Sequence, residues 1–245
     1  MLTRAFGGLV AAMTLCALAY CQDISVDEAT SLKWERKSII DLERVLPDSK
    51  AVQVFIGEVL ASDHHGGKND PVGSPPVVSG YKFVDLKGDG EMELVSLLDY
   101  TGRMRPTELM VIENRDGHLH TAHLYAGEGG LGIGEIQRVV RDIKHDGRSE
   151  LLIPYALEPF ISPVIPTPHL VHVYVYQNGE LVQSDGAFLN YYKGEVLPKL
   201  EAELEALVER KPASDASSFD REVYQKSIDA KRKEIDALVR TLPKD

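Results

Sequence analysis

Residues 85–95 read Asp85-Leu-Lys-Gly-Asp89-Gly90-Glu-Met-Glu93-Leu-Val, and residues 142–152 repeat the pattern as Asp142-Ile-Lys-His-Asp146-Gly147-Arg-Ser-Glu150-Leu-Leu. In each copy an aspartate ends a hydrophobic run, an Asp-Gly pair follows, and a glutamate begins the next apolar run. Asp suits the backbone of tight turns, and Gly supplies positive φ angles at no steric cost. The pattern therefore predicts, in both places, two β-strands joined by a short acidic loop.

The two loops lie at matching places in an internal repeat, whose units span about residues 79–127 and 133–188. Strand-forming runs lie at 81–85, 93–98, 108–113 and 118–125 in the first unit, and at 137–142, 150–155, 170–176 and 180–183 in the second. An Asp-Gly or Asn-Gly pair joins the last two runs of each unit, as in β-hairpins. Because Asp85 and Asp142 lie 57 residues apart while Gly117 and Gly179 lie 62 apart, the second unit carries a five-residue insertion.

Four antiparallel strands per repeat of this length are typical of a β-propeller blade. The acidic loop resembles that of FG-GAP/VCBS-type repeats of integrin-alpha-like propellers, which is written roughly D-x-D-x-D-G-x-x-D-L. The resemblance covers about residues 79–188 and implies an extracytoplasmic protein that contacts a protein or a glycan rather than performing catalysis. Two blades are too few to close a propeller, which takes about four or more. We expect a two-sheet β unit covered by flanking helices; the alternative is a partial propeller completed by another chain.

The resemblance also implies a possible calcium site in each loop. Calcium-binding loops of this kind supply oxygens from the first, third, fifth and ninth positions, with glycine at the sixth. The candidate ligands are Asp85, Asp89, Glu93, Asp142, Asp146 and Glu150. The third position is Lys87 in one copy and Lys144 in the other, which replaces a carboxylate by a cation and should weaken calcium binding. Either the ammonium group neutralises the acids as an internal counter-ion, or the loop is a plain Asp-Gly turn with its lysine in solvent. We expect structural loops.

Helices are predicted on both sides of the repeats. Ser25-Val-Asp-Glu28 reads as a capping box that begins an amphipathic helix over about 26–46, and the apolar residues 51–60 predict a strand. Leucines at helical spacing from 197 to 207 and apolar residues from 219 to 242 predict a helical hairpin, with acids in its first helix and lysines and arginines in its second. The fold class is thus α+β: an antiparallel core of two propeller-blade-like four-stranded repeats, an N-terminal helix and a C-terminal helical hairpin. We expect the hairpin to pack on the β core, and pairing with a partner helix is the alternative.

The first 21 residues read as a signal peptide. A short positive region ending at Arg4 precedes the uncharged, apolar residues 5–19, and Ala17-Leu-Ala19 fits a cleavage site. Leu18-Ala-Tyr-Cys21 resembles a lipobox, although Tyr20 stands where a small residue is required, so lipid anchoring at Cys21 is the less favoured reading. Both cysteines lie in or beside this segment, which leaves the mature chain without an internal disulfide. The sequence predicts a secreted or periplasmic protein with a β-rich domain at 22–190 and the hairpin at 191–245.

Composition narrows the function classes. The chain has 245 residues, of which 43% are hydrophobic, so it can bury a sizeable core. Its formal net charge is −11 and its basic residues are scattered, which argues against nucleic-acid binding. No run is long and apolar enough to predict a transmembrane segment.

Three loops are the predicted contact surface, because loops carried on a rigid scaffold often hold recognition residues. They are residues 62–80, 126–134 and 159–168, and the last contains Pro159, Phe160, Pro163 and Pro166. We therefore expect a binding or scaffold module without catalysis, whose partner is a protein or a glycan. One alternative is a secreted hydrolase that uses Asp63, His64, His65 and Asp70 from the first loop. Another is a protein that assembles through its C-terminal helices.

Overall fold

The computed structural model describes residues 49–63, 76–99, 108–115, 118–125, 135–160 and 164–243. The chain divides into two compact units, one of residues 1–75 with 113–120 and one of residues 76–112 with 121–245. Within the described ranges, no helix is both long and apolar enough to span a bilayer. The predicted signal peptide and the predicted helix at 26–46 lie outside the described residues.

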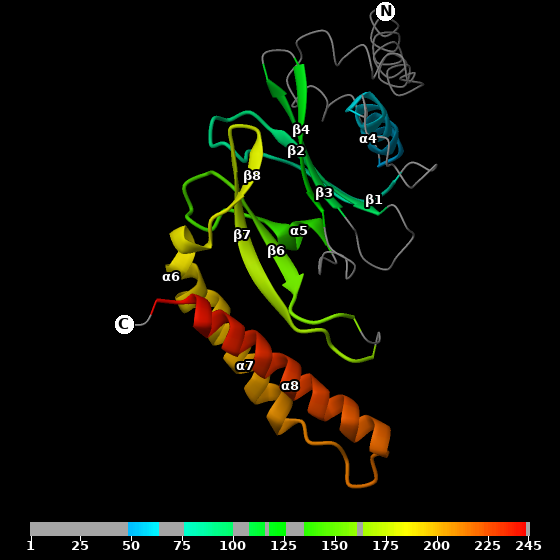
Figure 1. Cartoon of the computed structure of the whole chain (residues 1–245), viewed down its shortest axis with the longest axis vertical. Helices are drawn as coiled ribbons and strands as arrows, with labels where there is room; N and C mark the ends of the chain where they lie inside the picture. The colour runs from blue at the N-terminus through cyan, green and yellow to red at the C-terminus, as the bar shows by residue number, and fades with distance from the viewer. Residues whose placement is uncertain are drawn as a thin grey trace, which may run out of the picture. The chain divides into compact units, whose positions relative to one another are not determined.

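Helix α4 (Ser49–Asp63), the blue helix labelled in Figure 1, belongs to the first unit. Its buried side chains are Val52, Phe55, Ile56, Val59 and Leu60. They follow the i, i+3, i+4, i+7, i+8 spacing of one helical face. The prediction of a strand at 51–60 is therefore wrong. The run is apolar on nearly every position, which hides the helical period that its buried residues follow.

Two four-stranded antiparallel sheets form the β part of the chain. The first contains β1 (Val77–Val84), β2 (Glu93–Asp99), β3 (Glu108–Arg115) and β4 (His118–Tyr125), in that order. The second contains β5 (Val140–Arg141), β6 (Glu150–Ala156), β7 (His169–Gln177) and β8 (Glu180–Gln183), again in chain order. The α+β class and the repeated order of strands are confirmed, and neither sheet closes on itself.

The outer strand of the second sheet is much shorter than its counterpart in the first. A turn of helix, α5 (Ile136–Val139), replaces most of the strand predicted at 137–142, so that prediction holds only for Val140–Arg141. Ile136, Val139 and Val140 are buried at helical spacing, which explains the change. On β1, a Cβ atom at Gly80 would lie 3.4 Å from the Cβ of Ile136, so glycine permits this close approach.

One hydrophobic core lies between the two sheets. The first sheet and its loop contribute residues such as Leu86, Val95 and Leu97, and the second contributes residues such as Leu151 and Ile153. Burying one such side chain stabilises the fold by about 1.5–3 kcal/mol. A core shared in this way makes the two sheets depend on each other.

The C-terminal helices cover the other face of the second sheet. The chain leaves β8 through η1 (Asp185–Phe188), α6 (Leu189–Tyr191) and η2 (Tyr192–Val196), then forms the hairpin of α7 (Leu197–Glu209) and α8 (Ser218–Thr241) (Figure 1). Phe188 and Leu238 pack with Val173 and Val175 of β7 in a second core. The predicted hairpin and its packing on the β core are confirmed.

The hairpin is held by complementary charges and a cap. The Nζ of Lys231 on α8 lies 2.8 Å from an Oε of Glu203 on α7, as the opposite charges of the two helices predicted. Helix α8 begins at a capping box, in which the Ser217 hydroxyl accepts from the backbone N–H of Asp220 and the Asp220 carboxylate accepts from that of Ser217. This cap satisfies backbone donors that have no partner within the helix.

Candidate functional site

The first acidic loop is organised by its own carboxylates. Asp85 Oδ2 accepts a hydrogen bond from the N–H of Gly90 at 2.8 Å, and Glu93 Oε2 accepts one from the N–H of Leu86 at 2.7 Å. Asp89 Oδ1 accepts from the N–H two residues further on at 2.9 Å. The three predicted calcium ligands of this loop therefore serve as acceptors for backbone amides and close the turn.

The second loop repeats these three hydrogen bonds. Asp142 Oδ2 accepts from the N–H of Gly147 at 3.0 Å, and Glu150 Oε2 accepts from that of Ile143 at 2.9 Å. Asp146 Oδ1 again accepts from the amide two residues further on, at 3.0 Å. The repeat seen in the sequence is thus a repeat of hydrogen-bond geometry.

Backbone conformation explains the glycines of the loops. The fourth position has a positive φ in both copies, 77° at Gly88 and 56° at His145. The sixth position is also left-handed, with φ of 83° at Gly90 and 88° at Gly147. Residues with a Cβ rarely adopt this conformation, so the sixth position favours glycine in both loops.

Lys87 supplies a positive charge inside the first loop. Its Nζ lies 3.1 Å from Asp89 Oδ2, 3.2 Å from Glu93 Oε1 and 3.6 Å from Glu91 Oε2. Burial alone would lower the pKa of Lys87, but the hydrogen bonds and the charges of Asp89 and Glu93 outweigh burial and raise it. The Glu93 side chain is only 1% exposed, and burial raises its pKa despite the nearby ammonium group. Lys87 is therefore the counter-ion of a buried carboxylate.

Lys144, at the same position of the second loop, lies elsewhere. Its Nζ is placed 4.4 Å from the centre of the Phe188 ring, a cation–π geometry. Burial raises the pKa of Glu150, as it does that of Glu93. The two loops have matching hydrogen bonds to their backbone amides, but their lysine side chains lie in different places.

These contacts make the first loop poorly suited to bind calcium. Calcium takes six to eight oxygen ligands, whereas here an ammonium group lies among the acids and both oxygens of Asp85 already accept backbone N–H groups. Within the part of the chain that the structure describes, no group of three or more His, Cys, Asp or Glu side chains could hold a metal ion. The predicted ligands are brought together as turn-forming groups.

Arg148 joins the two loops. It occupies the seventh position of the second loop, where the first has Glu91. Its Nε donates to the carbonyl of Leu86 at 2.9 Å, and its Nη2 donates to the carbonyl of Tyr176 at 2.8 Å. The Ser149 N–H also donates to the carbonyl of Asp85 at 3.0 Å. Arg148 was not predicted as a functional residue, although the change of charge at this position between the two copies is a signal for it.

A polar cluster ties β7 to the helices that follow it. Asp185 Oδ1 accepts from the Val173 N–H and the Tyr192 hydroxyl, each at 2.7 Å. Its Oδ2 lies 2.6 Å from His172 Nδ1 and accepts from Gln183 Nε2 at 2.7 Å. Burial raises the pKa of Asp185, but these hydrogen bonds outweigh burial and lower it to about 2. Sequence reasoning missed this cluster because its members meet only after β7, β8 and η2 have packed.

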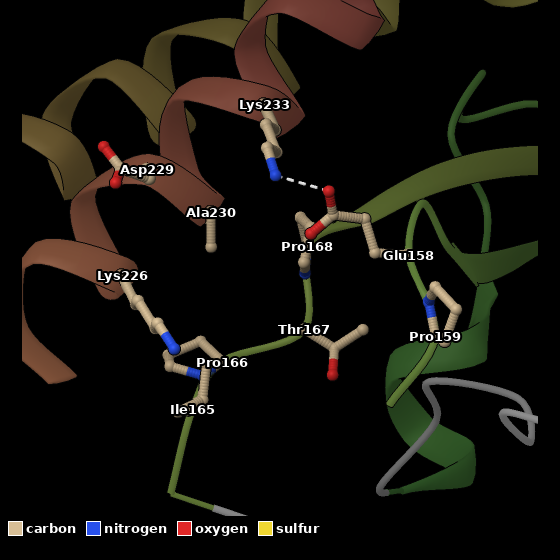
Figure 2. Close-up of a pocket in the computed structure, with 10 residues that line it drawn as sticks. All are labelled: Glu158, Pro159, Ile165, Pro166, Thr167, Pro168, Lys226, Asp229, Ala230 and Lys233. Carbon is tan, nitrogen blue, oxygen red and sulfur yellow. Dashed lines mark hydrogen bonds and ion pairs between the residues drawn. The ribbon is translucent and has the colours of Figure 1, made fainter. Parts of the chain in front are cut away.

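A pocket of about 270 Å³ lies between the proline-rich loop and α8 (Figure 2). Its loop wall includes Pro159, Ile165 and Pro166, and its helix wall includes Ala230, which is 8% exposed. Two of the predicted recognition residues, Pro159 and Pro166, thus line the pocket. Phe160 is half-exposed and does not line it, and the predicted Pro163 lies outside the described residues.

Charged side chains of α8 line this pocket. Lys233 forms an ion pair with Glu158 of the loop, and Lys226 Nζ lies 2.8 Å from Glu222 Oε1 on its own helix. Figure 2 shows both lysine side chains reaching toward the loop, whereas the carboxylate of Asp229 points away from it. The pocket therefore combines proline and isoleucine side chains of the loop with charged groups, two ammonium groups on α8 and the Glu158 carboxylate on the loop.

Other predicted site residues are not described. His64, His65 and Asp70 of the hydrolase alternative lie outside the described residues, as does the predicted contact loop 126–134. Asp63 ends α4. That alternative stays a prediction.

No family model, curated protein or solved structure matches this chain.

Proposed function

We propose that this protein is a binding module that recognises a segment of another polypeptide in the pocket between α8 and the loop residues 158–159 and 165–168. The observation that supports the proposal is the pocket itself. Its loop side is mainly proline and isoleucine, with Glu158 and Thr167, and its helix side is an alanine with charged residues on either side. Rigid walls lose little conformational freedom when a partner binds, which favours affinity.

The size of the pocket favours a side chain over a whole small molecule. Pockets for drug-sized ligands measure about 300–1,000 Å³. The volume here is about 270 Å³. It suits one or two anchoring side chains of a larger partner, as at the centre of many protein interfaces.

We also propose that the two sheets are blade-like repeats of the FG-GAP/VCBS type. The supporting features are the equal strand order and the acidic loop between the first two strands of each sheet. In this proposal the protein acts outside the cytoplasm, as residues 1–21 suggest, and the repeats are the scaffold that carries the recognition loop.

Selection from a random peptide library displayed on phage tests the binding proposal. The full chain serves as bait, and the affinities of the selected peptides are then measured by fluorescence anisotropy. Ala230→Leu should fill the pocket from the helix side and Ile165→Arg from the loop side, and each should weaken binding at least tenfold. Ala202→Leu, at an exposed alanine of α7, is the matched control and should bind like the wild type.

The proposal is overturned if no peptide is enriched, or if the selected peptides bind all variants equally. Circular dichroism and thermal unfolding establish that each variant is folded before its affinity is compared.

A further inference from the structure

We infer that the partner segment presents a carboxylate beside an apolar side chain, and that Lys226 and Lys233 bind this carboxylate. The inference rests on the proposed function and names the chemistry of its ligand. Neither lysine belongs to the core between the two sheets or to the core under the C-terminal helices. Both line the pocket.

The lysines and the alanine share one face of α8. Lys226, Ala230 and Lys233 follow each other at spacings of four and three residues, which places them along one side of the helix. Seven residues span about 10 Å of helix. The two lysines therefore lie on either side of the small Ala230 side chain in the lining of the pocket. Asp229 accepts a hydrogen bond from Gln225 on the same helix and is turned away from the loop (Figure 2).

Glu158 shows that the site accepts a carboxylate. Its side chain crosses from the loop to Lys233 of α8 (Figure 2). The side chains of this pair are 40% and 52% exposed, and an ion pair so open to water contributes little to stability. A carboxylate of the partner can therefore replace Glu158 at small cost. Lys226 pairs with Glu222 one turn earlier, which is another exposed and exchangeable contact.

The loop side of the pocket favours an apolar side chain beside the carboxylate of the ligand. Pro159 and Pro166 have no backbone N–H to donate, and with Ile165 they present hydrocarbon to the pocket. An apolar side chain gains most from such a wall, because its burial removes hydrocarbon from water on both partners. The pocket therefore combines apolar selection on the loop with anion selection on the helix.

Net charge sets a limit on the partner. The chain carries a formal charge of −11, which repels a long polyanion. Attraction to the two lysines acts over a short range, since exposed charges are screened within about 10 Å at ordinary ionic strength. A single carboxylate in an otherwise neutral segment satisfies both conditions.

Three labelled peptides test the inference. Gly-Ser-Leu-Asp-Leu-Ser-Gly is the probe, its Asp→Asn form removes only the charge, and its Asp→Lys form reverses it. The Asp peptide should bind the wild type at least tenfold more tightly than the Asn peptide. Lys226→Gln combined with Lys233→Gln should abolish this preference, whereas Lys199→Gln on α7 should leave it unchanged. Glu158→Gln should raise the affinity for the Asp peptide several-fold, since it removes the competing carboxylate.

The possible failures are distinguishable. Equal affinity for the Asp and Asn peptides, or a preference that survives in the double variant, overturns the inference. If one of these results is found while Ala230→Leu still abolishes peptide binding, the proposed function stands without the inference. If 4-methylpentanoate, a free carboxylate with the same apolar group as leucine, binds as tightly as the Asp peptide, the assignment to a polypeptide is wrong. If none of the peptides binds and library selection also fails, both proposals are overturned.

Discussion

At the scale of single residues, the two lysines show how one loop position serves two purposes. Lys87 lies among three carboxylates, while Lys144 lies against an aromatic ring. A buried carboxylate is costly unless a charge or hydrogen bonds compensate it. Glu93 has both an amide donor and the ammonium group, whereas the copy in the second loop, Glu150, accepts from an amide. Lys144 acts on Glu150 through its charge, whereas Lys87 lies 3.2 Å from Glu93 Oε1, so we attribute to Lys87 the larger stabilising role.

Replacing Lys87 by glutamine should lower the free energy of unfolding by about 1–3 kcal/mol. The substitution removes the charge that compensates buried Glu93, while the hydrogen bond from the Leu86 amide to Glu93 remains. Urea unfolding followed by circular dichroism measures the change. Lys144→Gln is the matched control at the same loop position. It should cost less than about 1 kcal/mol, because it removes a cation–π contact and the attraction of an exposed, well-solvated ammonium group to Glu150.

Calcium gives an independent check on the role of Lys87. If the ammonium group takes the place of an ion, the melting temperature of the wild type should be equal in millimolar calcium and in chelator. A clear rise with calcium, or equal losses of stability in the two lysine variants, would contradict the counter-ion assignment.

At the scale of elements, the strands and helices that could be predicted from the sequence are those whose hydrophobic pattern has one clear period. Strands β2, β3, β4, β6, β7 and β8 were predicted because turn residues bound short apolar runs. Helices α7 and α8 were predicted because their leucines keep helical spacing. The run at 51–60 was misassigned because it is apolar on nearly every position, and the run at 137–142 because its short apolar stretch suits a strand or a helical turn equally.

Asp185 connects β7 to the C-terminal helices by hydrogen bonds, and its pKa makes this connection dependent on pH. Its pKa of about 2 in the folded state lies below the ordinary value of 3.8, so its contribution is present above about pH 4 and is lost as the pH falls toward 2. Asp185→Asn should lower the free energy of unfolding at pH 7 by about 2 kcal/mol. It should also flatten the fall in stability between pH 4 and pH 2.

Urea unfolding at a series of pH values measures both effects. Asp236→Asn, at an exposed position of α8, is the control and should keep the wild-type pH profile. An Asp185→Asn profile parallel to that of the wild type would show that the aspartate does not carry this pH dependence.

At the scale of the whole chain, the candidate site depends on contacts that a sequence pattern does not contain. The proline-rich loop was recognisable as a recognition surface from its composition. Its opposing wall comes from Lys226, Ala230 and Lys233, about sixty residues further along the chain. Helical spacing places these three residues on one face, but only the packing of the hairpin on the second sheet brings that face to the loop.

Arg148 makes another contact that a sequence pattern does not contain. It connects the two sheets through hydrogen bonds to the carbonyls of Leu86 and Tyr176. The planar guanidinium group of arginine can donate to both carbonyls at once, whereas the ammonium group of lysine is a compact donor on a flexible stem. Arg148→Lys should therefore lower the free energy of unfolding by about 1–3 kcal/mol. Since the sheets share one core, the protection of amides against hydrogen exchange should fall by a similar free energy in β2 and in β6.

Hydrogen exchange followed by mass spectrometry measures both strands in a single experiment. Arg138→Lys is the matched control, because Arg138 is 79% exposed and pairs with Glu135 at 3.5 Å on its own helical turn. It should leave both strands protected as in the wild type. Loss of protection in β6 with β2 unchanged would show that the sheets unfold separately, and that Arg148 stabilises only the second. Loss in both strands would establish that the loop contact and the shared core make the two repeats one cooperative unit.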